Sequence, residues 1–176
     1  MLRQRHNQSI PKLNILLLSN GQFMKNTQFI FILSIIIISL ILGSCSKQIK
    51  VIDYGKDECD FCKMLIEDNR FGCVLTTGDG NQLKFDDVGC MISYALVKNT
   101  LDSADQKFNV TVFTMPDTFV DAKKAYFVHN DNIGSPMGYN VMAFDRDDSS
   151  KEFIGENGGE EMKWDEVVNM VIETAQ

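Results

Sequence analysis

Two sulfur-bearing side chains, Cys62 and Met64, stand two positions apart in the chain. Side chains at this spacing point the same way in an extended loop, so both sulfur atoms can reach one ion. A thiolate and a thioether are soft ligands, which select Cu(I) over hard cations. Cys59 lies three positions before Cys62 and is a further candidate ligand. The spacing therefore predicts a site for a soft monovalent cation such as Cu(I).

Two more candidate ligands, His129 and Met137, lie in the second half of the chain. Most methionines fill protein cores, but Met137 is flanked by Pro136 and Gly138 in a predicted loop, where burial is not the default. His129 is the only histidine after residue 44, which excludes a zinc or copper site built from several imidazoles. A histidine at the end of a strand also serves as a hydrogen-bonded surface residue, so both interpretations of His129 stay open.

The cysteines admit three other interpretations. Cys59 and Cys62 have the spacing of a thiol–disulfide oxidoreductase, although such a motif normally follows a strand and begins a helix, and here a polar tether precedes it. Together with Cys73 and Cys90 they could form a four-cysteine zinc site, but the second pair lacks the CxxC spacing. Two structural disulfides are the third alternative, which an oxidising compartment would favour.

The remaining polar residues indicate no catalytic centre. Cys90 falls inside a predicted helix and is interpreted as a small buried hydrophobic residue. Asp86 is the predicted N-cap of that helix, and Asp86 and Asp87 are interpreted as capping and solvated groups. The chain shows no Ser-His-Asp or Cys-His arrangement, no glycine-rich phosphate loop and no paired carboxylates. The sequence therefore predicts a binding protein and not an enzyme.

Hydrophobic periodicity predicts an α+β fold. The expected strands cover residues 71–77, 82–85, 108–114, 125–129, 141–144 and 152–154, and the expected helices cover residues 86–98 and 164–174. A turn at Gly78–Asn81 joins the first two strands, and residues 147–150 are expected to turn into the strand at 152–154.

A short internal similarity suggests duplication. Lys84–Val88 matches Lys163–Val167, with an aromatic residue before acidic residues and an apolar helix face in each. We therefore expect two similar strand–strand–helix–strand units side by side, over residues 58–115 and 116–176. Met64 and Met137 both lie in loops before a predicted hairpin, so the two methionines should approach one seam between the units.

The N-terminal part has the pattern of an export signal. The charge-free run Phe29–Leu42 would span about 21 Å as a helix, which is shorter than a hydrocarbon core of roughly 30 Å. It precedes Gly-Ser-Cys45, which looks like a lipobox. We expect residues 1–44 to be a signal peptide, with translation starting at Met24, and Cys45 to carry the lipid.

The segment after the signal is strongly acidic. Residues 1–44 contain four of the 17 basic residues and none of the 24 acidic ones, so the remainder has 13 basic residues and a formal charge of −11. Such a charge disfavours nucleic-acid binding and suits cation handling. Residues 45–57 are expected to form a lipidated tether, and Lys47 near the lipid site favours the outer membrane.

Several of these segments, taken in order, resemble the NosL family. The resemblance is carried by Cys59-Asp60-Phe61-Cys62-Lys63-Met64, Lys84–Met91, Tyr126–His129, Ser135–Gly138 and Ala143-Phe144. Cys62 and Met64 match the family's core Cys and Met. The family commonly has glycine between these two residues, where this chain has Lys63, and Cys59 is not universal in it.

The resemblance implies a function and a place in the cell. NosL-like proteins are outward-facing lipoproteins with two similar α+β halves, which bind one Cu(I) and help supply copper to nitrous oxide reductase during denitrification. We therefore expect Cu(I) as the cargo, nitrous oxide reductase or its assembly machinery as the partner, and a lipid-anchored position in the cell envelope facing the periplasm. Service to another cuproenzyme is the alternative within the same class.

Overall fold

The structure is a computed structural model that describes residue 49 and residues 52–174. The predicted signal peptide over residues 1–44, the predicted start at Met24 and the predicted lipid site Cys45 lie outside these residues. Within the part described, no helix combines the length and the apolar character that a membrane span needs.

The first half begins with the predicted hairpin. Strands β1 (Cys73–Thr76) and β2 (Gln82–Phe85) pair antiparallel. Gly80 supplies the positive φ of 84° that the turn between them requires. Helix α2 (Val88–Val97) follows, and its N-cap is Asp87, whose carboxylate accepts the amide hydrogen of Cys90 at 3.0 Å. The predicted N-cap, Asp86, is therefore wrong by one residue.

Strands β3 (Lys107–Val112) and β4 (Met115–Asp121) complete the first half. β3 confirms the strand predicted over residues 108–114, but the sequence pattern does not predict β4. Its first four residues are exposed, and Pro116 and Asp117 are poor strand formers. β4 forms because it folds back onto β3 as an antiparallel partner, with a register irregularity at Thr111 and Val112.

The second half also opens with a hairpin. Strands β5 (Tyr126–His129) and β6 (Val141–Phe144) confirm two predicted strands and pair antiparallel with each other. The predicted hairpin of residues 141–144 with a strand at 152–154 was wrong, so Met137 lies inside the β5–β6 loop and not before a hairpin. Two further elements, strand β7 (Glu160–Met162) and helix α4 (Trp164–Thr174), end the described chain. Helix α4 confirms the predicted helix, and β7 pairs with β5.

Helix α3 (Asp147–Asn157) occupies the region where we predicted a turn and a strand. That prediction was wrong because residues 147–150, which favour turns, also favour the first turn of a helix. Asp147 and Asp148 lie at the positive end of the helix dipole, and Lys151 Nζ pairs with Asp147 Oδ2 at 2.7 Å one turn later.

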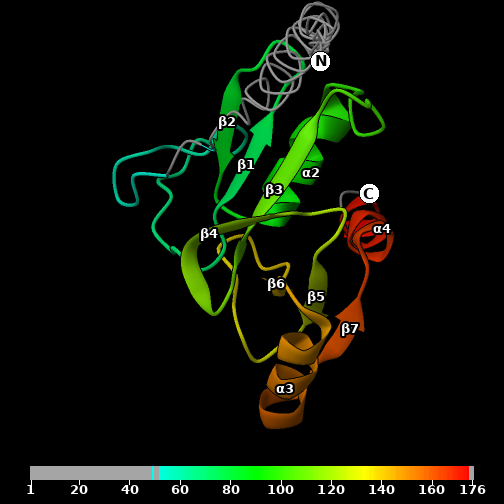
Figure 1. The fold of residues 1–176 in the computed structure, drawn as a ribbon. Helices are drawn as coiled ribbons and strands as arrows, with labels where there is room; N and C mark the ends of the chain where they lie inside the picture. The colour runs from blue at the N-terminus through cyan, green and yellow to red at the C-terminus, as the bar shows by residue number, and fades with distance from the viewer. Residues whose placement is uncertain (1–48, 50–51, 175–176) are drawn as a thin grey trace, which may run out of the picture. The chain divides into compact units, whose positions relative to one another are not determined.

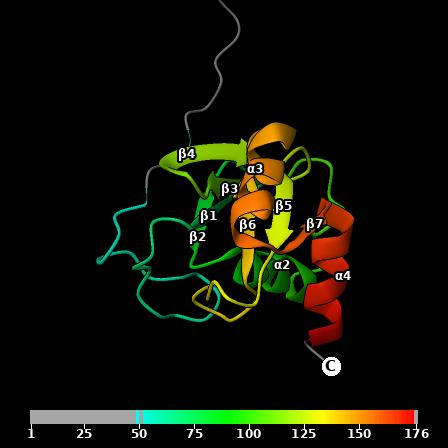
Figure 2. The same ribbon diagram turned by 90° about the horizontal axis from the view of Figure 1, so that it is seen from below.

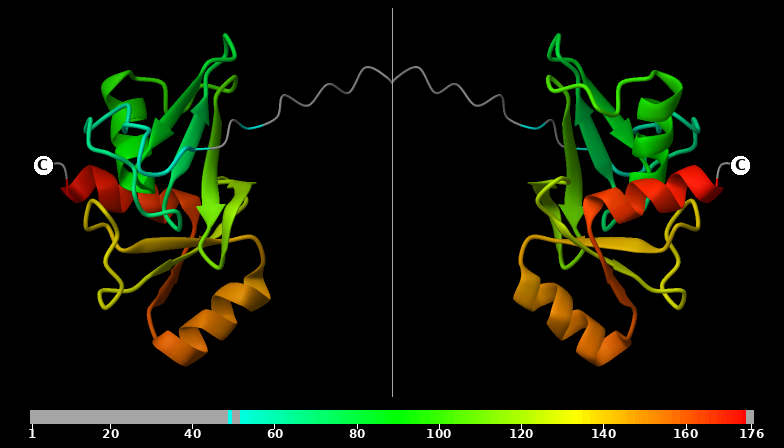
Figure 3. Two further views of the ribbon diagram at one scale, coloured as in Figure 1. Left: turned by 90° about the vertical axis from the view of Figure 1, so that its left-hand side faces the viewer. Right: turned by 90° about the vertical axis from the view of Figure 1, so that its right-hand side faces the viewer.

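All seven strands of the described residues belong to one mixed sheet. The order is β2-β1-β3-β6-β5-β7, and β4 pairs with β3 off this path. The two halves are joined through β3 and β6, which pair in parallel at Val112 and Ala143. In Figure 3 the strands of the second half run crosswise to those of the first.

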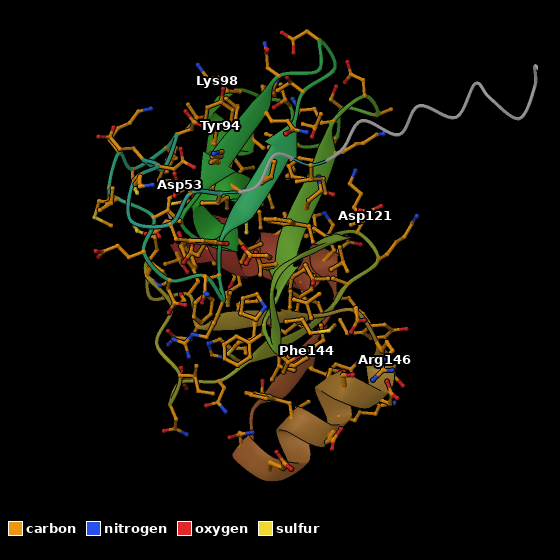
Figure 4. All side chains as sticks on the ribbon, turned by 60° about the vertical axis from the view of Figure 1, so that its left-hand side comes forward. Asp53, Tyr94, Lys98, Asp121, Phe144 and Arg146 are labelled. Atoms are coloured by element: carbon orange, nitrogen blue, oxygen red, sulfur yellow. The ribbon has the colours of Figure 1, made fainter. Side chains whose placement is uncertain are left out.

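Helices cover both faces of the second hairpin (Figures 1 and 3). The larger core cluster joins α2 and α4 to the sheet through residues such as Met91, Val167 and Phe127. A smaller cluster lies on the α3 side, where the rings of Phe144 and Phe153 are 5.2 Å apart. Figure 4 shows Phe144 on the side of the sheet that faces α3.

The element order confirms two strand–strand–helix–strand units within an α+β fold, namely β1-β2-α2-β3 and β5-β6-α3-β7. The predicted correspondence of Lys84–Val88 with Lys163–Val167 was wrong. The segment at Lys84 ends β2 and leads into α2, so its counterpart in the second unit is the end of β6, which leads into α3. The error arose because α4 resembles α2 in sequence, whereas α3, which takes the place of α2 in the second unit, has little apolar character.

Candidate metal centre

A tight turn before the first hairpin, Cys59–Met64, carries three of the predicted ligands. The amide of Cys59 donates to the Met64 carbonyl at 2.8 Å, and the amide of Lys63 donates to the Cys59 carbonyl at 3.0 Å. Asp60 fastens the turn to β2, because its amide donates to the Lys84 carbonyl and its carboxylate accepts the Lys84 amide, both at 2.8 Å. The sulfur-bearing loop is therefore fixed to the sheet.

Lys63 sits at the tip of this turn with a left-handed φ of 63°. Glycine adopts this conformation without steric cost, which explains the glycine that the family resemblance implies here. The Lys63 side chain is 65% exposed, and its Nζ lies 3.8 Å from Asp60 Oδ1. The ammonium group therefore stays in solvent and pairs with a carboxylate.

The turn places Cys59 and Cys62 against the first turn of α2, which carries Cys90. The three Sγ atoms all lie within 4.8 Å of one another. Cys59 and Cys90 are buried, with exposed fractions of 0% and 2%, and Cys62 is partly exposed. The site is thus a three-sulfur cluster that opens to solvent on the Cys62 side.

Cys59 is the anionic member of the cluster. Its sulfur accepts hydrogen bonds from the Cys90 thiol and from the amides of Cys62, Asp86 and Phe61, which lower the pKa of Cys59 from 9.0 to about 5 against the opposing effect of burial. Hydrogen bonds to the charged form stabilise a buried thiolate. The side chain is therefore a thiolate at neutral pH.

The other two cysteines keep their protons. The hydrogen bond to the Cys59 thiolate, together with burial, raises the pKa of Cys90 far above its usual range. Burial also raises the pKa of Cys62. Nearby, burial and the charges of Asp87 and Cys59 raise the pKa of the Asp86 carboxyl to about 6. Negative charge is thus concentrated at the site, which favours a cation.

The geometry suits a thiophilic metal ion. A metal–sulfur bond of about 2.3 Å places the ligand sulfurs roughly 4 Å apart, so small side-chain rotations would bring the three Sγ atoms around one ion. Among the described residues, no other group of three Cys, His, Asp or Glu ligand atoms comes this close together. Three sulfurs without a fourth protein ligand form a soft, open site.

Asp87 connects this cluster to the second half of the chain. One carboxylate oxygen accepts the Cys90 amide, and the other accepts the Ser135 hydroxyl and the Met137 amide, each at 3.1 Å. The Tyr139 ring packs where a Cβ of Gly89 would stand, 2.1 Å from that position. The loop at residues 134–139 is therefore held over the start of α2.

The predicted approach of two methionine loops is partly visible. A pocket of about 480 Å³, here named the Met64 pocket, lies between the loop after Cys62 and the loop around Ser135; its lining residues are Met64, Leu65, Glu67, Asp68, Asp86, Gly134, Ser135 and Pro136. Figure 2 shows the two loops side by side. Met64 and Met137 are 47% and 37% exposed, and Met137 is not among the lining residues. Ligation by either thioether stays a prediction.

Two other predicted candidates lie elsewhere. His129 lines a different pocket with Asn130 and Glu160, and its Nε2 lies 3.5 Å from Asp131 Oδ1. Its role as a ligand stays a prediction. Cys73 is buried in β1 and its thiol donates to the Phe71 carbonyl at 3.2 Å, outside the cluster. The four-cysteine zinc site is therefore not assembled, and none of Cys59, Cys62, Cys73 and Cys90 forms a disulfide.

Sequence reasoning missed Cys90 as a site residue. Its interpretation as a buried hydrophobic side chain is right about burial but overlooks what lies beside it. The available signal was its position three residues after Asp87: an N-cap fixes the direction of the first helical turn. What the sequence does not show is that Asp60 binds Lys84 and so brings the CxxC turn onto that helix end.

Comparisons with known proteins agree with this fold. A crystal structure described as the copper chaperone NosL from Shewanella denitrificans superposes with a TM-score of 0.57 at 24% identity, covering 69% of this chain and 96% of that one. No curated protein matches this chain. The profile of the NosL family matches residues 52–172, which include every cysteine of the cluster. The chain therefore belongs to the NosL family.

Proposed function

We propose that this protein is a Cu(I) chaperone that supplies copper to nitrous oxide reductase. The observation that carries the proposal is the cluster of Cys59, Cys62 and Cys90, whose sulfur atoms lie within 4.8 Å of one another. Membership of the NosL family supports it, and the structural relative from Shewanella denitrificans is described as a copper chaperone.

Three sulfur ligands favour monovalent copper over divalent zinc. Structural zinc takes four ligands in a tetrahedron, and the three-sulfur cluster lacks a fourth Cys, His, Asp or Glu among the described residues. Cu(I) is a softer ion and accepts thiolate and thioether ligands readily. Met64 lies two residues from Cys62 and is 47% exposed, and in this proposal its thioether adds a weak ligand at the open side.

The gradient of exposure across the site suits transfer. Cys59 and Cys90 lie at the buried side, while Cys62 and Met64 lie at the exposed side. An incoming ligand can therefore replace the outer sulfurs first, and the ion then leaves by stepwise exchange. A closed four-ligand cage would oppose such a release.

The place of action follows from the N-terminal motif. In this proposal Cys45 carries a lipid that anchors the protein in the cell envelope, facing the periplasm. The tether predicted over residues 45–57 is shorter than expected, because Ile52 is buried in the core and Asp57 pairs with Lys84. The proposal predicts that Cys45→Ser abolishes incorporation of labelled fatty acid. Labelling that persists in this variant would contradict it.

Copper binding is tested by anaerobic titration of the reduced protein with Cu(I) in competition with bicinchoninate. We expect one tight equivalent, which weakens strongly in Cys59→Ser, Cys62→Ser and Cys90→Ser. Cys73→Ala is the matched control, because Cys73 lies outside the cluster. Wild-type affinity in both Cys62→Ser and Cys90→Ser would refute the site. X-ray absorption should show three sulfur neighbours at about 2.3 Å.

Delivery needs a separate test. The copper-loaded protein is mixed with copper-free nitrous oxide reductase, and the recovered activity is compared with that obtained from the same amount of Cu(I) supplied as its bicinchoninate complex. Faster or fuller recovery with the loaded protein is the expected result. Equal recovery from both sources would reject delivery to this enzyme and leave the copper site intact.

A thiol–disulfide oxidoreductase is the second candidate, because the CxxC motif includes a thiolate with a pKa of about 5. The positions of the two cysteines oppose this function. An attacking thiolate must be accessible, yet the thiolate here is the buried Cys59 and the partly exposed Cys62 has a raised pKa. Insulin reduction catalysed by the metal-free protein would favour the oxidoreductase.

A further inference from the structure

Large exposed apolar side chains concentrate near the sulfur cluster. Six such side chains occur among the described residues, and four of them, Phe61, Met64, Leu65 and Met137, lie on the two loops that meet there. Their exposed fractions range from 37% to 47%. Grouped apolar side chains on a surface mark contact sites, whereas single ones do not.

Two of these side chains, Met64 and Leu65, line the Met64 pocket, which also has an acidic lining. Asp86, Glu67 and Asp68 contribute three carboxylates to it. The Asp68 carboxylate is held by Arg70 at 2.6 Å. None of the ion pairs found between residues 52 and 174 includes Asp86 or Glu67. Two carboxylates therefore line the pocket with no basic side chain of the described chain to balance them.

Asp86 lies deep in this arrangement. It is 3% exposed, and its amide donates to the Cys59 sulfur. A buried carboxylate without a cationic partner is costly, and a positive group that entered the pocket would lower that cost. The acidic pocket thus borders the metal cluster and is complementary to a cation.

The charge also decides between possible occupants. An anionic membrane surface would be repelled by the carboxylates. A second copy of this chain would present the same acidic pocket and exposed loops, so like charges would face each other. A different protein that combines a basic side chain with apolar side chains would match both features of the surface.

We propose that the Met64 pocket, together with the exposed side chains of Phe61, Leu65 and Met137 on its two loops, is a docking surface for a protein that presents a Lys or Arg side chain beside apolar ones. The basic group enters toward Asp86 and Glu67, while Leu65 and Phe61 pack on the apolar neighbours. The proposal rests on the proposed function, because docking here would bring the recipient's ligands to Met64 and Cys62. It extends that function by naming the surface and the chemistry of the partner.

The probe is the peptide acetyl-Gly-Met-Lys-Leu-Gly-amide, added to the full-length, copper-loaded protein while amide resonances are followed by NMR. We expect saturable shifts confined to residues 61–68, 86–87 and 134–137. The same peptide with glutamate in place of lysine should bind at least about tenfold more weakly, since a single close charge pair contributes that much. Equal binding of both peptides, or the absence of localised shifts, would overturn the proposal.

Matched variants assign the binding to the surface. Glu67→Lys and Leu65→Ser should each weaken peptide binding about tenfold. Glu152→Lys and Val97→Ser make comparable changes at exposed positions outside the pocket. These two variants should change the affinity for the peptide less than twofold. Shifts of the same resonances that depend only on protein concentration would show a second copy as the occupant and overturn the proposal.

The outcome is separable from that of the proposed function. Each sample is titrated with bicinchoninate to measure Cu(I) retention, which should be unchanged in Glu67→Lys and Leu65→Ser. Retained copper without peptide binding would reject the docking surface alone. Peptide binding by a protein that does not hold copper would support the docking surface and reject the chaperone.

Discussion

The hydrogen bond from Cys90 to Cys59 gives the most direct test of the metal centre. The Cys90 thiol is the strongest influence that lowers the pKa of Cys59 to about 5. A hydrogen bond to a charged group contributes about 1.5–3 kcal/mol, and one pKa unit corresponds to about 1.4 kcal/mol, so Cys90→Ala should raise the pKa of Cys59 to roughly 6–7.

Cys90→Ser separates the role of Cys90 as a hydrogen-bond donor to Cys59 from its proposed role as a copper ligand. A serine hydroxyl still donates to the Cys59 thiolate but is a poor ligand for Cu(I), so the pKa of Cys59 should stay near its wild-type value. Both variants should lose Cu(I) affinity by more than roughly 100-fold, because losing a ligand costs more than losing an outer contact. The two variants should therefore agree in copper binding and differ in thiolate titration.

The assay is the ultraviolet absorbance of thiolate in the metal-free, reduced protein as a function of pH. Because the pKa values of Cys62, Cys73 and Cys90 are raised, the first ionising thiol should be Cys59. A midpoint near pH 5 in wild type and Cys90→Ser, and a higher one in Cys90→Ala, is the expected result. An unchanged midpoint in Cys90→Ala would refute the hydrogen-bond argument.

The same hydrogen bond has a signature in stability. The pKa of Cys59 is lower in the folded chain than its ordinary value of 9.0, so ionisation stabilises the fold fully above pH 9 and this stability is lost as the pH falls through about 5. Cys90→Ala should therefore lower the free energy of unfolding by about 2 kcal/mol at pH 7. The difference in the free energy of unfolding between wild type and Cys90→Ala should narrow below about pH 5. Urea denaturation at several pH values measures it.

Three further substitutions test how the site is supported. Lys63→Gly should raise the free energy of unfolding by about 1 kcal/mol, because φ is 63° at this position. It should leave Cu(I) affinity unchanged, because the Lys63 side chain is in solvent. A change of affinity in the bicinchoninate titration would contradict this. Gly89→Ala should cost about 1–3 kcal/mol despite the higher helix propensity of alanine, because the new Cβ meets the Tyr139 ring; thermal denaturation measures it, and a stabilised variant would disprove the close packing. Asp87→Ala should loosen the Met137 loop, because it removes the oxygen that accepts the Met137 amide hydrogen. Faster amide hydrogen exchange at Met137 measures this, and exchange at the wild-type rate would exclude that anchoring role.

The hairpins and the last helix could be predicted because each follows from a local pattern. Alternating side chains around Gly78–Asn81 predict the first hairpin, and the apolar stripe of α4 predicts its helix. Helix α3 and strand β4 could not be predicted in this way. In α3 only Ser150 is fully buried, and β4 is an exposed edge strand. Both elements are defined by what they pack against, which a local pattern does not contain.

The sulfur site likewise has residues that a local pattern predicts and one residue, Cys90, that it does not. The neighbours Cys59, Cys62 and Met64 could be found because their spacing is local. Cys90 lies on a separate element beyond the first hairpin, and its approach depends on the hydrogen bonds between Asp60 and Lys84 and on the N-cap at Asp87. Each contact is plausible for its residue types, but nothing in the sequence selects them from many alternatives. The structure adds Cys90, from a second element, to the predicted loop cysteines Cys59 and Cys62.

The charge state of the cluster explains how one arrangement serves both the empty and the loaded protein. Three thiolates without a metal would repel one another strongly in a buried site. Here only Cys59 is ionised, and the Cys90 proton with three backbone amides stabilises it. A bound Cu(I) would take over the role of that proton. Binding to all three sulfurs must then release two protons, from Cys62 and Cys90, and affinity must rise with pH. If the proposed function holds, the metal-free site is already shaped for copper, because hydrogen bonds occupy the positions that metal–sulfur bonds would take.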